Sequence, residues 1–241
     1  MNVLVRLGAV LTALALLAGC ATKPAIPLDR TSAKEIKTIG ILTPDMPTGP
    51  SAILASTPGQ SFGLVGALID AGIESSRESD LKAALAGKSF TPYDRLMGGI
   101  KAALEAQGYV VKKVAVARTE RGEFLKTYPS ANSENVDAYL DVVLFRYGYG
   151  AAGISASTPY RPSVETRVRL VTAKDSRVLM EDIVFYNRIF TALETNNVTI
   201  APDPEYSFAA FSDLTSNPDK AVEGLDLAFV KSTEAVGVLL R

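Results

Sequence analysis

The chain has 241 residues, of which 47% are hydrophobic, and its 25 basic and 26 acidic residues give a formal net charge of −1. Charges this balanced and this interspersed lack the basic stripe that nucleic acid binding requires. The sequence contains no histidine, which excludes the commonest general base and metal ligand, and its one cysteine excludes a disulfide framework.

The amino terminus has the three parts of a secretory signal. Arg6 supplies the positive start, Leu7 to Leu17 the apolar core, and Ala18 and Gly19 the small residues before Cys20. The apolar run is shorter than the roughly 20 residues that cross a bilayer, which disfavours an uncleaved membrane anchor. Ordinary secretion with a chance cysteine is the other alternative. The sequence Leu17-Ala18-Gly19-Cys20 resembles the lipobox of bacterial lipoproteins.

This resemblance implies cleavage between Gly19 and Cys20, with a diacylglyceryl thioether and palmitate-type acyl chains on Cys20. Such a modification removes the thiol from redox and metal chemistry. In a Gram-negative cell, Ala21 stands where an aspartate would retain the protein in the inner membrane. We therefore expect a lipid anchor at the periplasmic face of the outer membrane.

Three segments are predicted from the composition. Residues 1–19 form the signal peptide, residues 20–35 a lipidated tether with two prolines, and residues 36–241 a single periplasmic domain. A tether of this length, fully extended, reaches roughly 50 Å at about 3.3 Å per residue. We expect it to contribute nothing to the core.

The first part of the predicted domain contains a strand, a loop and a long helical stretch. Residues 36–42 form a short isoleucine-rich run that is typical of a first strand. Residues 43–61 carry several prolines, so we expect a long loop of the kind that is often functional. Residues 62–73 are apolar nearly all round a helix, and residues 74–87 continue with amphipathic spacing.

A second helix and strand follow. Thr91, Pro92 and Asp94 form a helix start signal, and Gly108 is typical of a helix end. Residues 109–117 (YVVKKVAVA) follow at once and are predicted to be a strand. A helix that returns directly to a strand is common in α/β sheets.

The second half predicts more strands and a terminal helix. Residues 136–149 are apolar on both faces, which indicates a central strand. Residues 164–171 and 178–186 flank a short polar turn and predict an antiparallel hairpin. After an irregular stretch, Asn217 and Pro218 begin a last helix, whose apolar stripe should cover one face of the sheet.

Together these elements predict one α/β (α+β) domain, with a mixed sheet of about five strands, helices packed on it, a C-terminal antiparallel hairpin and a terminal helix. Their order resembles the α/β domain shared by the TolB amino-terminal region and the curli-assembly lipoprotein. Three stretches carry this resemblance: IKTIGILTP (36–44), VDAYLDVVLFRYG (136–148) and RLVTAKDSRVLMED (169–182). Asp141 and Ser176 stand where glycine is usual. The resemblance implies envelope assembly or protein binding at the outer membrane, without chemistry.

The sequence offers weak candidates for chemistry. Ser155 and Ser157 lack the glycine frame of a nucleophile elbow. The pair of Asp137 and Asp141 would be about 13 Å apart on a strand, too far for one ion, and the acidic residues at 74–80 are interspersed with basic ones. We therefore expect no enzyme activity, no cofactor and no metal. Five basic residues cluster near the hairpin with Tyr160, either as a solvated face or as a surface for an acidic partner or lipid: Arg161, Arg167, Arg169, Lys174 and Arg177.

The apolar helix at 62–73 is the predicted interaction element. Since a helix on a sheet is covered on one side, its remaining faces need either a second subunit or partner, or burial within the domain, and the sequence leaves these open. The possible interface residues are Phe62, Leu64, Val65, Leu68 and Ile69. The sequence thus predicts a non-enzymatic, lipid-anchored envelope protein that acts as a protein-binding or assembly factor, with either envelope proteins or a second copy of the chain as its partner. The alternative is an accessory lipoprotein of a transport system that binds lipid or a small apolar ligand between helix and sheet.

Overall fold

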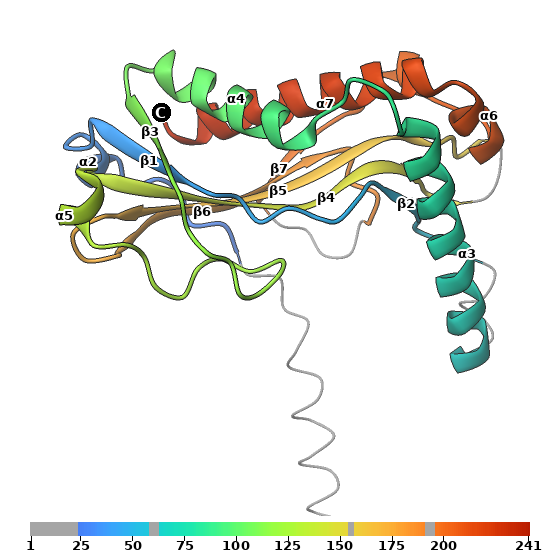
Figure 1. Cartoon of the computed structure of the whole chain (residues 1–241), viewed down its shortest axis with the longest axis horizontal. Helices are drawn as coiled ribbons and strands as arrows, with labels where there is room; N and C mark the ends of the chain where they lie inside the picture. The colour runs from blue at the N-terminus through green and yellow to red at the C-terminus, as the bar shows by residue number, and fades with distance from the viewer. Residues whose placement is uncertain (1–23, 58–62, 154–156, 191–195) are drawn as a thin grey trace, which may run out of the picture.

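A mixed sheet is the centre of the fold, as Figure 1 shows. The computed structural model describes residues 24–57, 63–153, 157–190 and 196–241. In these residues the sheet has 7 strands in the order β3-β1-β4-β5-β6-β7, with β2 paired to β4. The strands are β1 Thr38–Leu42, β2 Ser51–Leu54, β3 Val110–Val114, β4 Ala138–Ala151, β5 Arg161–Thr172, β6 Val178–Tyr186 and β7 Val198–Ile200.

The strand β4 is the axis of this sheet. Its first half pairs in parallel with β1, its second half pairs in parallel with β2, and its other edge pairs antiparallel with β5. It is buried along nearly its whole length, which confirms the prediction of a central strand. Its register with β5 shifts between Leu144 and Arg146, so Phe145 is the extra residue of a β-bulge.

Two long helices, α4 (Pro92–Glu105) and α7 (Pro218–Leu239), cover one face of the sheet (Figure 1). Each begins with proline in its first turn, as predicted, although the Thr91 side chain makes no capping hydrogen bond. The helices contribute Ile100, Leu104 and Phe229 to the main core, where they pack against Leu140 and Val168 of the sheet. The terminal helix therefore covers a sheet face as the sequence predicted.

A second core cluster lies where the 23-residue helix α3 (Gly63–Leu85) reaches the sheet. Leu81 near its carboxyl end is fully buried there with Ala52, Tyr149 and Leu225. The amino-terminal half of α3 runs away from the body, below the sheet in the view of Figure 1. Shorter elements complete the chain: α2 Arg30–Ala33, α5 Ala131–Glu134, the 3-10 turn η3 Pro204–Tyr206 and α6 Phe211–Ser216.

The predicted single α/β domain with an antiparallel hairpin is confirmed, while the predicted strand count was too low. The strand β2 lies within residues 43–61, which were expected to be loop, and β7 lies in the stretch that looked irregular. Both are short strands held by distant partners, which no local pattern reveals. Ser176 in the hairpin turn has a φ of 57°, the left-handed geometry that usually favours glycine.

The prediction that residues up to 35 contribute nothing to the core is wrong for residues 26–33. Ile26 and Glu181 of β6 exchange backbone hydrogen bonds of 2.7 and 2.9 Å, and the Asp29 N–H donates to the Leu179 carbonyl at 2.9 Å. Leu28 packs against the main core. This segment therefore lies along β6, where its backbone groups are satisfied by the sheet.

Candidate functional site

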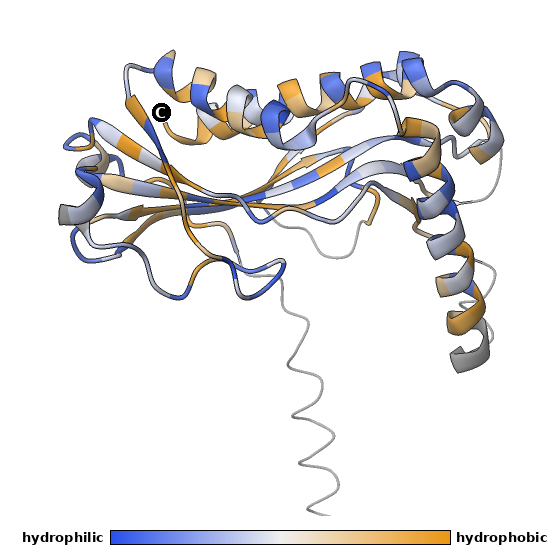
Figure 2. Cartoon of the chain, in the orientation of Figure 1, coloured by the Kyte–Doolittle hydropathy of each residue, from blue (hydrophilic) through white to orange (hydrophobic). Residues whose placement is uncertain are grey.

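The projecting end of α3, residues 63–73, carries three of the exposed large apolar side chains of the described chain. Figure 2 shows apolar residues on this end, away from the body. The side chains of Leu68 and Ile69 are 68% and 58% exposed, and Ile73 is exposed as well. Large apolar side chains gathered in one exposed place are typical of interaction sites.

The structure describes the predicted interface residues only in part. Leu68 and Ile69 are exposed, so the alternative of burial within this domain is wrong for these two residues. Leu64 and Val65 lie in the first turns of α3. Phe62 lies outside the described residues, as do Gly19 and Cys20.

The projecting end carries one charged residue, and that residue is bonded. The Thr57 hydroxyl donates to the Asp70 carboxylate at 2.5 Å. This hydrogen bond connects the chain that follows β2 to α3. Upstream of Asp70 the sequence has no charged residue back to Asp45. Polar residues return at Glu74 and continue along the helix.

A hollow of 480 Å³ lies between the loop before β2 and the part of α3 that follows the projecting end, residues 74–82. Glu74, Glu78 and Lys82 of α3 line it, together with Arg146 of β4. Burial raises the pKa of Glu78, and the neighbouring Glu74 carboxylate raises it further. This hollow is open and charged, unlike the apolar pockets that hold small apolar ligands.

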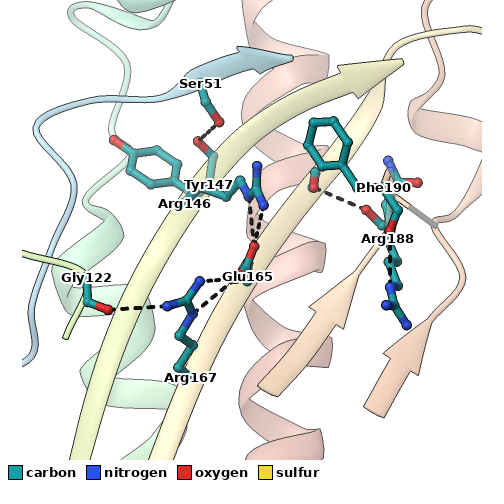
Figure 3. Close-up of polar contacts among 10 residues, drawn as sticks. Ser51, Gly122, Arg146, Tyr147, Glu165, Arg167, Arg188 and Phe190 are labelled. Carbon is teal, nitrogen blue, oxygen red and sulfur yellow. Dashed lines mark hydrogen bonds and ion pairs between the residues drawn. The ribbon is translucent and has the colours of Figure 1, made fainter. Parts of the chain in front are cut away.

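The face of the sheet opposite α4 and α7, here called the underside, carries a cluster of arginines (Figure 3). Side chains alternate along β5, so Glu165, Arg167 and Arg169 point away from the helices that Val164 and Val168 contact. Arg146 and Arg167 both bind the Glu165 carboxylate, at 2.6 and 2.9 Å.

Aromatic rings hold the arginines of the underside in place. The Arg167 guanidinium carbon lies 3.7 Å from the ring centre of Phe145, the residue of the bulge, and that of Arg146 lies 5.2 Å from the Phe190 ring centre. Because two guanidinium groups share the buried carboxylate of Glu165, this group keeps a net positive charge. The bulge is what brings Phe145 and Arg146 into the group, and the sequence signal for it is the break in alternation at Phe145-Arg146-Tyr147.

A second group on the underside is neutral. Arg169 pairs with Glu181 at 2.8 Å and stacks on Phe124, with its guanidinium carbon 4.2 Å from the ring centre. The Tyr128 hydroxyl is beside it, and burial, with the Asp141 carboxylate adding to the effect, raises the pKa of Tyr128 to about 12. Arg169 is thus already satisfied within the fold.

The basic cluster seen in the sequence is divided in space. Arg167 and Arg169 meet on the underside, whereas Arg161 donates to Ser207 and Arg177 pairs with Asp29 at 3.0 Å. Lys174 lies exposed in the hairpin turn. Tyr160 is buried in the second core cluster. The solvated-face interpretation therefore holds for Lys174, and the other residues of the cluster have partners in the fold.

The carboxylates considered as metal ligands have structural partners. Asp137 accepts the Lys37 and Thr38 amides, each at 2.8 Å, and the buried Asp141 accepts from Arg118 at 2.6 Å and from the Leu125 amide at 2.7 Å. Among the described residues no group of three or more potential ligands is close enough to hold a metal ion. Ser155 lies outside the described residues. Arg118 was not singled out from the sequence, since nothing local distinguishes it from a surface arginine.

No helix in the described ranges has both the length and the apolar character needed to cross a bilayer. The projecting end of α3, residues 63–73, is a short helical stretch. Its eleven residues extend about 16 Å at 1.5 Å per residue.

No protein-family model and no curated protein matches the chain. Among solved structures it is similar to a Xanthomonas campestris protein described by the family model DUF330, at 13% identity over 90% of this chain and 92% of that one, with a TM-score of 0.44. It is similar to the PelC dodecamer protein of Paraburkholderia phytofirmans at 11% identity over 92% and 96%, with a TM-score of 0.35. It is also similar to lipoprotein GNA1162 of Neisseria meningitidis at 13% identity over 66% and 85%, with a TM-score of 0.23. All three are bacterial proteins, and these likenesses carry no argument about function.

Proposed function

We propose that this chain is a non-enzymatic, lipid-anchored protein of the bacterial envelope that acts by binding, as an assembly or accessory factor. The projecting end of α3 is its interaction element. The observation that carries this proposal is the exposure of Leu68, Ile69 and Ile73 on a helix that leaves the body. Burying such side chains contributes about 1.5–3 kcal/mol each, so an apolar surface is expected to cover them.

The lipid anchor is supported by the residues before the fold. The signal-like run, the small residues Ala18 and Gly19, and Cys20 stand a few residues before the first described residue, Pro24. Two or more acyl chains hold a protein on a membrane durably. The proposal places the body at the periplasmic face of the outer membrane.

The structural roles of the carboxylate side chains support the proposed absence of enzyme activity. In the described residues, Asp137, Asp141, Glu165 and Glu181 all serve as acceptors for backbone amides or arginines inside the fold. A catalytic acid or base needs a free edge toward a substrate. No cofactor or metal belongs to this proposal.

The alternative function, an apolar ligand held between helix and sheet, has no specific support. Side chains of α4 and α7 fill the layer above the sheet, since Leu96, Ile100 and Phe229 are buried against it. The hollow beside α3 is lined by charged groups. The layer formed by α4 and α7 therefore has a structural role, and the proposal assigns binding to α3.

The test uses the mature chain, residues 20–241, with Cys20→Ser, so that acyl chains do not contribute to binding. We expect this chain to sediment with isolated envelope membranes, and Leu68→Asp to weaken the binding roughly tenfold or more, because a charge replaces a contacting apolar group. The control is Val238→Asp on α7, where the side chain is 58% exposed. Circular dichroism and thermal unfolding should stay unchanged in both.

Two results would contradict the proposal. One is an unlipidated chain that leaves envelope membranes unbound. The other is a Leu68→Asp variant that binds them as tightly as its parent, since α3 would then not be the interaction element.

A further inference from the structure

The segment that leads to the anchor is short. Residues 26–33 are fixed along β6 by the hydrogen bonds of Ile26 and Asp29, and Arg177 holds the Asp29 carboxylate at 3.0 Å. Only residues 20–25 remain between the docked segment and the proposed lipid. Six residues span roughly 20 Å at about 3.3 Å each, less than half the reach that the sequence suggested.

The chain leaves the body from the underside of the sheet. Pro24 and Ala25 line a hollow together with Gly122, Arg167 and Arg169, and these two arginines point away from the helix layer. Figure 1 shows this start of the described chain on the side of the sheet opposite α4 and α7. A lipid on Cys20 would thus hold the underside within roughly 20 Å of the bilayer surface.

The projecting end of α3 lies on this same side. In Figure 1, α3 descends past the edge of the sheet, away from the layer formed by α4 and α7. It points to the side of the sheet on which the described chain starts. The anchor and the exposed apolar helix therefore approach one common surface.

The exposed positions of the projecting end lie on more than one side of the helix. At 100° per residue they cover about two-thirds of the circumference, and Asp70, bonded to Thr57, lies on the remaining side, so one protein surface lying against one side would leave others in water. A bilayer covers an inserted helix end on all sides. The exposed positions are Ala67, Leu68, Ile69, Ala71, Gly72 and Ile73.

We propose that the occupant of this surface is the bilayer itself: the projecting end of α3 inserts into the leaflet that carries the lipid on Cys20. This rests on the proposed lipid anchor and names the partner of the proposed interaction element. A length of about 16 Å is roughly half of a hydrocarbon core of about 30 Å, so the helix enters one leaflet without crossing. Residues 63–69 of α3 carry no charge, which suits insertion, whereas Asp70, whose carboxylate accepts from Thr57, and Glu74 lie toward the level of the head groups.

The charge of the underside fits the same orientation. Arg146 and Arg167 share one carboxylate and keep a net positive charge, and this group faces the side from which the anchor leaves. Phospholipid head groups supply phosphates to such a surface. The arginine group would therefore lie over the head groups while α3 is inserted beside it.

The chain contains no tryptophan, which allows a clean test. Leu68→Trp places a fluorophore on the projecting end, and Val238→Trp places one on the exposed side of α7 as the matched control. Both are made in the mature Cys20→Ser chain and added to protein-free vesicles of phosphatidylethanolamine and phosphatidylglycerol, with and without brominated acyl chains. We expect a blue shift and a loss of fluorescence to the brominated chains for Leu68→Trp, and neither for Val238→Trp.

The outcomes separate this inference from the proposed function. Binding to envelope membranes without binding to protein-free vesicles would overturn the bilayer as occupant, indicate an envelope protein, and leave the interaction element standing. A blue shift of Leu68→Trp that depends on protein concentration without vesicles would indicate a second copy and would also overturn it. Absence of binding to both envelope membranes and protein-free vesicles would contradict both proposals.

Discussion

Asp141 shows how a single buried charge organises the underside. Its side chain is fully buried, and it accepts hydrogen bonds from Arg118, the Leu125 amide and the Tyr128 hydroxyl. These three partners lie in the loop between β3 and β4, so one carboxylate fixes that loop on the sheet. Asp141, which stands where glycine is usual in the family that the chain resembles, is therefore the acid of a structural ion pair with Arg118.

Replacing Asp141 should destabilise the fold. We expect Asp141→Asn to lower the free energy of unfolding by about 3–5 kcal/mol, because Arg118 remains buried without its counter-charge. Urea denaturation measures this. The exposed pair of Lys231 and Glu234 gives the control, since Glu234→Gln should change stability by less than about 0.5 kcal/mol. A loss for Asp141→Asn as small as that of the control would contradict the role assigned to the buried pair.

Asp29 gives the docked amino-terminal segment a dependence on pH. Hydrogen bonds from Ser32, with smaller contributions from Arg177 and Thr31, lower the pKa of Asp29 from 3.8 to about 2. Because the folded-state pKa is lowered, the stabilisation is complete above about pH 4 and is lost as the pH falls through about 2.

We therefore expect the amides of Ile26 and Asp29 to exchange faster with solvent, relative to the core of β4, as the pH falls from 4 to 2. Hydrogen exchange, corrected for the intrinsic pH dependence of the exchange rate, measures this. In Asp29→Asn the segment should be loosened throughout that range and show no such change. If the substituted chain shows the same change with pH, another carboxylate is responsible.

At the scale of elements, α4 and α7 approach each other through glycines. A Cβ at Gly99 would lie 2.8 Å from the Thr233 Cβ, and a Cβ at Gly237 would lie 2.9 Å from the Ala103 Cβ. At Gly98, one residue earlier, a Cβ would meet nothing within 4 Å. The close contact of the two helices therefore requires glycine at position 99, which faces α7, and does not require it at position 98.

Gly98 and Gly99 provide a matched pair of variants. Gly99→Ala should destabilise the fold by about 1–3 kcal/mol, because α4 and α7 are forced apart. Gly98→Ala should leave stability unchanged or raise it by up to about 1 kcal/mol through helix propensity. Thermal unfolding compares them, and equal effects of the two substitutions would show that the helices tolerate a wider spacing.

The elements also show what the sequence can and cannot reveal. Helix starts at Pro92 and Pro218, and the hairpin of β5 and β6, were predictable because their signals are local. The strand β2, the docking of Ile26 on β6 and the Arg146 group were not, since each depends on partners far along the chain. For the candidate site, the apolar character of residues 62–73 was readable, whereas the exposure of Leu68 required the fold.

At the scale of the whole molecule, the fold has two unlike sides. One side is closed by α4 and α7. The other side carries the arginine group, the start of the described chain and the projecting end of α3. In the proposed orientation this second side faces the membrane, and the helix layer faces the periplasm.

The proposed orientation depends on a lipid on Cys20 that holds this second side to the membrane. The intact mass of the protein extracted from membranes tests it most directly. We expect a chain that begins at Cys20 and carries a diacylglyceryl group with a further acyl chain, a modification that Cys20→Ser abolishes. A mass that corresponds to an unmodified chain, or to one that retains residues 1–19, would contradict it.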